Sequence, residues 1–176
     1  MINKIDFFLK KLYPINRSLT GQGNRITLKS LKEIIPLRIK SIKSLTKVYD
    51  WVVPLEWKIS NAFISDENGN KIIDFKKNNL HIVSYSIPIK KRISKVELFK
   101  HLHSLRNLKN AIPYVTSYYK KYWGFCINHK QKLFFEKQYK DNDKFKVVIK
   151  SNFKKNGSLT YGELIIPGRS KKEILI

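Results

Sequence analysis

The chain has 176 residues, of which 42% are hydrophobic and 12% aromatic, which is enough for a buried core and too much for a disordered protein. No apolar run approaches the ~18 residues of a transmembrane helix, so we expect no membrane partner. The net charge of +23 favours polyanions, but the lysines are spread among Asn and Ile, as AT-biased coding also produces, and no nucleic-acid-binding motif accompanies them. We therefore expect no specific nucleic-acid partner.

The N-terminal part predicts two helices joined by a glycine-containing loop. Apolar residues follow helical spacing over 3–12, at Ile5, Phe8, Leu9 and Leu12, and Pro14 should end this helix. Charged residues interrupt the apolar ones, unlike in a signal peptide, so we expect a cytoplasmic protein. A loop over 15–23 precedes a second helix, which begins near Asn24 and ends at Pro36.

From about residue 37 the pattern favours strands. They are predicted around Ile39 and Ile42, and over 48–53, 62–64, 72–75 and 80–87, the last closed by Pro88. The segment 66–70 contains an Asn-Gly pair, which tolerates positive φ and predicts a hairpin turn.

The second half predicts one helix among further strands. Ser94 and Glu97 have the spacing of a capping box, and the apolar stripe that follows extends to Leu105. Strands are predicted over 114–119, 124–127, 132–135, 145–149 and 159–166, with a second hairpin turn at Asn156-Gly157. We interpret the apolar run 173–176 as an interrupted strand; a frayed tail is the alternative.

No self-contained catalytic constellation is visible. His101 and His103 lie two residues apart on a predicted helix, where their side chains diverge by about 200° and cannot share a metal ion. Zinc-protease, serine-hydrolase and phosphate-loop motifs are absent from the sequence. We expect His81 to be packed rather than a ligand. Cys126, in the aromatic stretch 122–127, should be a buried structural thiol.

Six stretches, taken together and in order, resemble one family. They are LYPINRSLTG (12–21), VYDWVVPLEW (48–57), NLHIVSYS (79–86), IPYVTSYY (112–119), WGFC (123–126) and GSLTYGE (157–163). They are similar to the N-terminal region of the bacterial aminopeptidase-like family, which has a co-catalytic zinc aminopeptidase fold with an inserted β-rich domain of unknown function. Members are often encoded near polysaccharide-biosynthesis genes.

The resemblance implies a particular anatomy. The family fold is α/β overall, and this chain should be α+β: residues 1–53 form the N-terminal part of an incomplete core, 54–166 the β-rich inserted domain, and 167–176 the start of the return to the core sheet. In the complete family member, zinc is held by residues that follow this strand. The resemblance therefore implies no catalytic residue, metal ligand or cofactor in this chain. Its expected partner is the remaining C-terminal part of the enzyme or a second copy.

The resemblance also suggests where substrate would pass, because the inserted domain is expected to lie over the catalytic cleft. Asn16 and Arg17 in the polar loop, and Tyr118 and Trp123 in the insert, are the substrate-proximal candidates. Alternatively, Arg17 ties the loop to a helix end and the two aromatic residues belong to the core. We expect the N-terminal portion of a zinc-metallopeptidase-type hydrolase that is inactive alone. A noncatalytic β-rich binding module linked to polysaccharide biosynthesis is the alternative, with a charge-driven nucleic-acid binder behind it.

Overall fold

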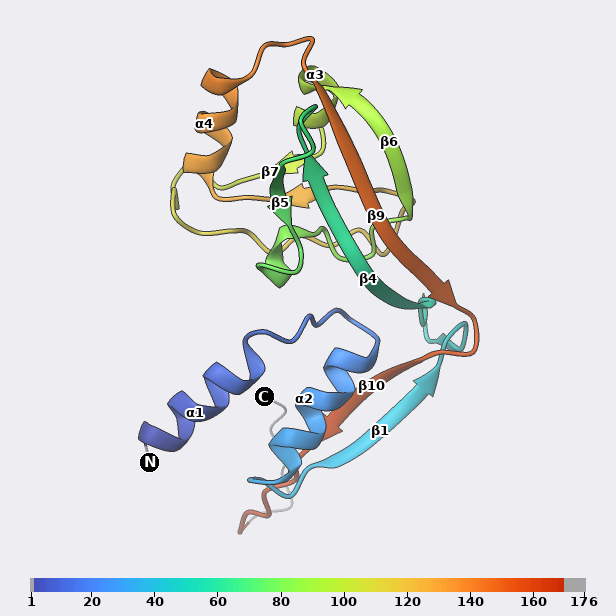
Figure 1. The fold of residues 1–176 in the computed structure, drawn as a ribbon. Helices are drawn as coiled ribbons and strands as arrows, with labels where there is room; N and C mark the ends of the chain where they lie inside the picture. The colour runs from blue at the N-terminus through green and yellow to red at the C-terminus, as the bar shows by residue number, and fades with distance from the viewer. Residues whose placement is uncertain (1, 170–176) are drawn as a thin grey trace.

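The computed structural model describes residues 2–169 and has the expected α+β architecture. Figure 1 shows two halves, an upper one built on a four-stranded sheet and a lower one with two helices and a strand pair. Within the described residues no helix has both the length and the apolar character needed to cross a membrane. The strand predicted at 173–176 lies outside the described residues.

The upper half is organised around an antiparallel sheet in the order β5-β4-β9-β6. Its strands are β4 (Glu56–Ser65), β5 (Lys71–Asp74), β6 (Ile89–Ser94) and β9 (Lys144–Lys154). The predicted hairpin between β4 and β5 is confirmed: Gly69 has a φ of 85°, and Asp66 Oδ1 accepts a 2.8 Å hydrogen bond from the Asn70 amide.

One face of this sheet supplies most of the core. Alternate residues of β4, β5 and β9 point inward, as the period of two requires, and include Ile64, Ile73, Phe145, Val147 and Ile149. They belong to the same buried cluster as side chains from α3 (Lys95–Phe99), α4 (His129–Gln138) and β8 (Phe125–Cys126), namely Leu98, Phe135 and Phe125. Cys126 of β8 is fully buried, as predicted.

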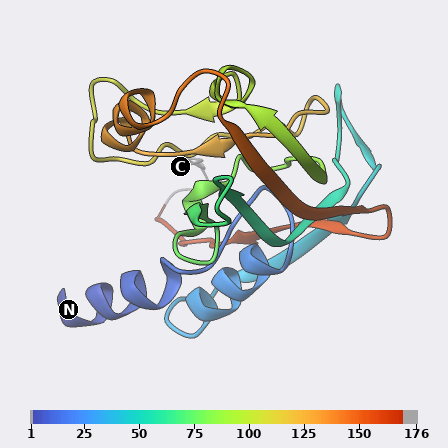
Figure 2. The same ribbon diagram turned by 45° about the horizontal axis from the view of Figure 1, so that its top comes forward.

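The lower half joins distant parts of the sequence. It contains α1 (Ile2–Leu12), α2 (Gln22–Lys32) and an antiparallel pair of β1 (Arg38–Lys43) with β10 (Ser158–Glu163). Figure 2 shows α2 lying along this strand pair, and the Asn24 side chain donates a 2.7 Å hydrogen bond to the Thr160 carbonyl. β10, which the predicted domain 54–166 includes, thus pairs with a strand of the first segment. The boundaries themselves stay a prediction.

The turn at Asn156-Gly157 does not make a hairpin, so that prediction is wrong. β9 pairs with β4 and β6, whereas β10 pairs with β1, so the chain passes from one sheet into another at this turn. A Cβ on Gly157 would overlap the Glu56 side chain. The glycine therefore permits a close approach between segments rather than a two-stranded ribbon.

The continuous strand predicted over 48–53 is also wrong. The segment forms a tight hairpin of β2 (Lys47–Val48) and β3 (Trp51–Val52), with Tyr49 at the turn. Tyr49 has a φ of 53° and is 93% exposed. The preference of tyrosine for strands is therefore overridden at Tyr49 by the geometry of the turn.

The strand predicted over 80–87 is replaced by irregular structure. A short 3-10 turn, η1 (Asn79–His81), begins where the Asn78 side chain accepts a 3.0 Å hydrogen bond from the Leu80 amide, and Tyr85 has a φ of 67°. The actual strand, β6, lies beyond Pro88. One isolated bridge, between Ser84 and Thr116, ties this region to 114–119, which is not a strand as predicted either.

Two helix predictions also change. Ser94 caps α3 by accepting a hydrogen bond from the Glu97 amide, but α3 ends at Phe99, and β7 (Leu102–His103) follows, paired in parallel with β8. His101 and His103 therefore do not share a helix. The segment predicted as a strand over 132–135 lies in α4, which starts with a capping box between Asn128 and Gln131.

Candidate functional site

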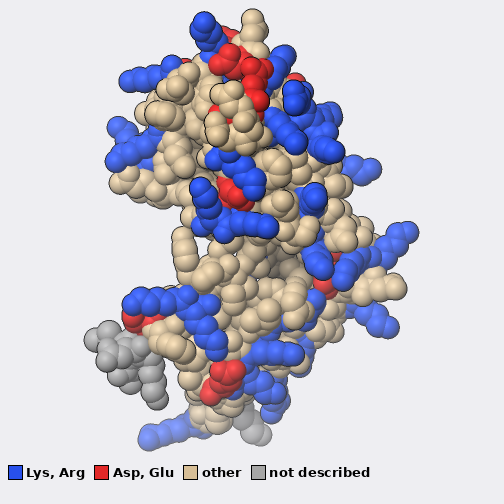
Figure 3. All heavy atoms as spheres, in the orientation of Figure 1, with Lys and Arg blue, Asp and Glu red and all other residues tan. Residues whose placement is uncertain are grey.

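A cleft of about 470 Å³ brings three of the four candidate residues together. Its lining includes Asn16 and Arg17 from the loop after α1, Asn79 and Leu80 of η1, and Tyr118. Trp123 is not among the lining residues. In Figure 3 the waist between the two halves is a tan, hollowed region bordered by Lys and Arg side chains, which cover both halves of the visible face.

Asn16 and Arg17 hold the loop in place as well as lining the cleft. Arg17 Nη1 donates a 2.6 Å hydrogen bond to the Leu12 carbonyl at the end of α1, where helix carbonyls lack partners. Asn16 Nδ2 donates to the Asn79 carbonyl at 3.3 Å, and Asn79 Nδ2 donates to the Tyr13 carbonyl at 2.8 Å. The substrate role of Asn16 and Arg17 stays a prediction, with this tethering role beside it.

The two aromatic candidates have different surroundings. Tyr118 is half-buried, with its ring 3.9 Å from that of Tyr119 and 5.9 Å from that of Tyr85, measured between centroids. Trp123 is buried in the core and stacks on His101 at 3.7 Å. Tyr118 can therefore meet a ligand in the cleft, whereas Trp123 packs within the fold.

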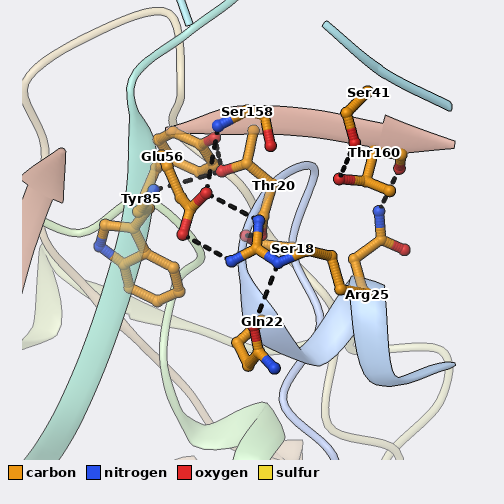
Figure 4. A network of polar contacts seen from close by, with 11 residues as sticks. Ser18, Thr20, Gln22, Arg25, Ser41, Glu56, Tyr85, Ser158 and Thr160 are labelled. Carbon is orange, nitrogen blue, oxygen red and sulfur yellow. Dashed lines mark hydrogen bonds and ion pairs between the residues drawn. The ribbon is translucent and has the colours of Figure 1, made fainter. Parts of the chain in front are cut away.

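A polar network supports the loop from behind (Figure 4). Arg25 of α2 makes a bidentate ion pair with Glu56 of β4, with both N···O distances 2.8 Å, and the Ser158 amide donates to the same carboxylate at 3.1 Å. The Arg25 hydrogen bonds lower the pKa of Glu56, and the Glu56 hydrogen bonds raise the pKa of Arg25. This pair connects α2, β4 and β10 at the point where the two halves meet.

A second contact within this network fixes the end of the loop. Thr20 Oγ1 and the Tyr85 hydroxyl lie 2.6 Å apart, and the Trp57 amide donates to Thr20 Oγ1 at 3.2 Å. Burial raises the pKa of Tyr85 to about 12, so this hydroxyl stays protonated at physiological pH. A Cβ on Gly23 would overlap the Asn16 carbonyl, so the glycine lets α2 start against the loop.

Sequence reasoning missed Arg25, Glu56, Thr20 and Tyr85. The ion pair joins residues 31 apart and the hydroxyl pair residues 65 apart, and neither leaves a local pattern. The only signal in the sequence was the pair of glycines in the 15–23 loop, which indicates backbone freedom there but identifies no partner.

The described residues do not fit a zinc ion. Within 2–169 no three His, Cys, Asp or Glu side chains lie close enough together to hold a metal. The Nδ1 atoms of His81 and His101 each lie 2.8 Å from a backbone carbonyl, that of Cys126 and that of Trp123 respectively. His81 is buried as predicted, and burial lowers its pKa. Burial also raises the pKa of the Cys126 thiol to about 12, which makes it a poor nucleophile.

Comparison with known proteins places the chain. A family model described as a domain of unknown function (DUF2172) matches residues 56–152, more than half of the sequence. The chain belongs to this family. The matched DUF2172 residues begin with β4 and end within β9, so they include the four-stranded sheet with α3 and α4 and leave out the lower half.

Two similar proteins from Clostridium acetobutylicum extend the match beyond the DUF2172 region. One, described as a polysaccharide biosynthesis protein with an aminopeptidase-like domain, is 45% identical over 96% of this chain and 37% of its own length. The other, a crystal structure of a candidate peptidase, has a TM-score of 0.80 and 44% identity over 91% of this chain and 36% of its own. The predicted resemblance to the aminopeptidase-like family is confirmed. This chain spans little more than a third of the relatives' length.

Proposed function

We propose that this DUF2172 chain is the N-terminal portion of an aminopeptidase-like protein of the zinc-metallopeptidase type, and that it does not hydrolyse peptides alone. The observation that carries the proposal is the 45% identity along 96% of the chain to a protein with an aminopeptidase-like domain, of which the match covers 37%. Zinc and the catalytic base would come from the remaining part of such a protein. The described residues have no cluster that fits the metal.

The exposed face of α1 supports a partner of this kind. Ile5 and Leu9 lie one turn apart on α1, and Tyr13 follows directly after the helix, with its amide hydrogen-bonded to the Leu9 carbonyl; the three residues are 56%, 65% and 59% exposed. We propose that this face packs against the remaining part of the longer protein; a second copy of the chain is the alternative occupant.

The proposal predicts where zinc binds and where hydrolysis occurs. In a chimera in which this chain replaces the matching 37% of the Clostridium relative, we expect chelator-sensitive release of an N-terminal amino acid and tight zinc. We expect neither from this chain alone, since no described residues form a metal site. Hydrolysis of aminoacyl p-nitroanilides and zinc analysis measure both. Chelator-sensitive activity from the isolated chain would overturn the proposal.

Within this function, Asn16, Arg17 and Tyr118 would border the substrate path, because they line one cleft. In the chimera we expect Arg17→Ala to raise KM several-fold with a smaller change in kcat, as for a group that contacts bound substrate. Arg38→Ala, an exposed position on β1, is the matched control. If Arg17→Ala left KM unchanged and lowered the melting temperature, Arg17 would have no role in substrate binding and would act only by holding the loop to Leu12.

The alternative, a noncatalytic β-rich binding module, has one observation in its favour. The family match begins and ends with the strands of the four-stranded sheet, as expected for a unit used in its own right. A link to polysaccharide biosynthesis would come from the name of the Clostridium relative. An inactive but correctly folded chimera that retains zinc would favour this alternative.

A further inference from the structure

A second concavity shares Tyr118 with the cleft. We call it the apolar groove; it has a volume of about 670 Å³ and is lined by 51–55 and 117–121, together with Leu45, Tyr85 and Phe153. Its volume lies in the range of pockets that take small organic ligands, roughly 300–1,000 Å³. Among the described residues, Tyr118 is the one that lines both the groove and the cleft.

Large hydrophobic side chains of the groove remain open to solvent. Leu45 is 57% exposed, Val52 49% and Tyr119 78%. Folding of this chain gains nothing from leaving them so exposed. A concave group of exposed apolar side chains is the usual mark of a binding surface.

Backbone strain gathers at the same place. Within residues 2–169, three residues other than glycine have positive φ: Leu45 at 70°, Tyr49 at 53° and Tyr85 at 67°. Leu45 and Tyr85 line the groove, and Tyr49 lies in the hairpin turn two residues before Trp51. A left-handed conformation is costly for bulky residues, and such strain is concentrated at ligand-binding sites.

The charge at the rim has one sign. Lys120 and Lys121 are exposed and belong to the groove lining, and no Asp or Glu lines it within the described part of the chain. The groove thus combines an apolar surface with two lysines, which complements a ligand with an apolar body and an anionic head.

The polar groups of the groove disfavour a peptide as that ligand. The Ser117 hydroxyl donates to the Ser84 carbonyl at 3.2 Å, and the Tyr85 hydroxyl is engaged with Thr20. A peptide would have to bury its backbone amides against a mainly apolar lining, which is costly wherever an amide finds no partner. A hydrocarbon chain carries no such groups.

We propose that the apolar groove binds a single-chain anionic amphiphile, with its hydrocarbon chain along Leu45, Val52 and Phe153 and its phosphate or carboxylate head at Lys120 and Lys121. The ligand is a monomer from solution rather than a bilayer, because the surface is a groove and not a flat apolar face. This inference does not depend on the aminopeptidase-like function.

The test is titration with dodecyl phosphate below its critical micelle concentration, followed by tryptophan fluorescence. Trp51 is half-buried in the groove, whereas Trp57 and Trp123 are buried, so Trp51 is the reporter. We expect saturable one-to-one binding, a signal that Trp51→Phe removes, and affinity at least tenfold above that for inorganic phosphate or dodecanol. Calorimetry supplies the affinity of Trp51→Phe, which should stay within a few-fold of wild type.

Charge reversal at the rim separates head recognition from general stickiness. We expect the double variant Lys120→Glu with Lys121→Glu to bind dodecyl phosphate at least tenfold more weakly than wild type. Lys76→Glu with Lys77→Glu, an exposed pair outside the groove with the same change in net charge, should stay within twofold. Equal weakening in both double variants, or no saturable binding to wild type, would overturn the proposal. So would binding only to anionic vesicles, or a dimer that Val52→Lys dissociates and that excludes the amphiphile.

Discussion

Glu56 is the residue on which the two halves of the molecule converge. Its carboxylate accepts hydrogen bonds from Arg25 of α2 and from the amide of Ser158, the first residue of β10, while its own backbone begins β4. The Glu56 side chain is 9% exposed and that of Arg25 27%, so water competes weakly for these hydrogen bonds. A single side chain thus connects segments more than a hundred residues apart.

We expect Glu56→Gln to lower the free energy of unfolding by about 1.5–3 kcal/mol, the range for a lost hydrogen bond to a charged group. Glu163→Gln, which breaks the exposed pair with Lys40, should have a much smaller effect because water screens that pair, and it is the matched control. Urea denaturation at pH 7 measures both. Equal effects would show that the Arg25–Glu56 pair does not connect the halves energetically.

The same variant predicts a pH dependence. A carboxyl group whose pKa is lower in the folded state stabilises the fold above its unfolded pKa, here about 4.3, and this contribution is lost as pH falls through the folded value. The difference in stability between wild type and Glu56→Gln should therefore shrink between pH 7 and pH 3.5. A difference that stays constant or grows would contradict the assignment.

At the scale of elements, sequence patterns predicted what is decided locally. The helix over 3–12, the strand around Ile39 and Ile42 and the turn before Asn70 follow from residues within a few positions of one another. The segments 132–135 and 48–53 were wrongly predicted as continuous strands, because the apolar and aromatic residues of the first also fit a helix and those of the second also fit a tight hairpin. There the capping pair Asn128–Gln131 and the turn at Tyr49 decide the outcome.

The candidate site was predictable only in part, for the same reason. Asn16, Arg17 and Tyr118 came from stretches that resemble a family, and the fold brings them to one cleft. Trp123 came from the same reasoning, but it stacks on His101 in the core. The prediction failed because the sequence alone does not distinguish a core aromatic residue from an exposed one. The network behind the cleft depends on pairing between β1 and β10, which no local pattern encodes.

At the scale of the whole molecule, the elements differ in how extensively they pack against the rest of the chain. The four-stranded sheet encloses the buried cluster, and α2 is attached to the β1–β10 pair through Asn24 and to β4 through Arg25. α1 extends from the lower half (Figure 1), and from Ile5 onward all its side chains are exposed except half-buried Phe8 and Leu12. A short helix without packing is marginal in water.

The two N-terminal helices therefore provide a matched comparison, since each has 11 residues. In hydrogen exchange on this chain, we expect amides of α1 to exchange at least about a hundredfold faster than those of α2, because opening α1 breaks few tertiary contacts. In the chimera with the remaining part of the Clostridium relative, Ile5, Leu9 and Tyr13 should become covered. The amides of α1 should then exchange almost as slowly as those of α2. Equal protection of the two helices in the isolated chain would show that α1 needs no partner. If α1 still exchanged about a hundredfold faster than α2 in the chimera, the remaining part of the longer protein would not be the partner of this face.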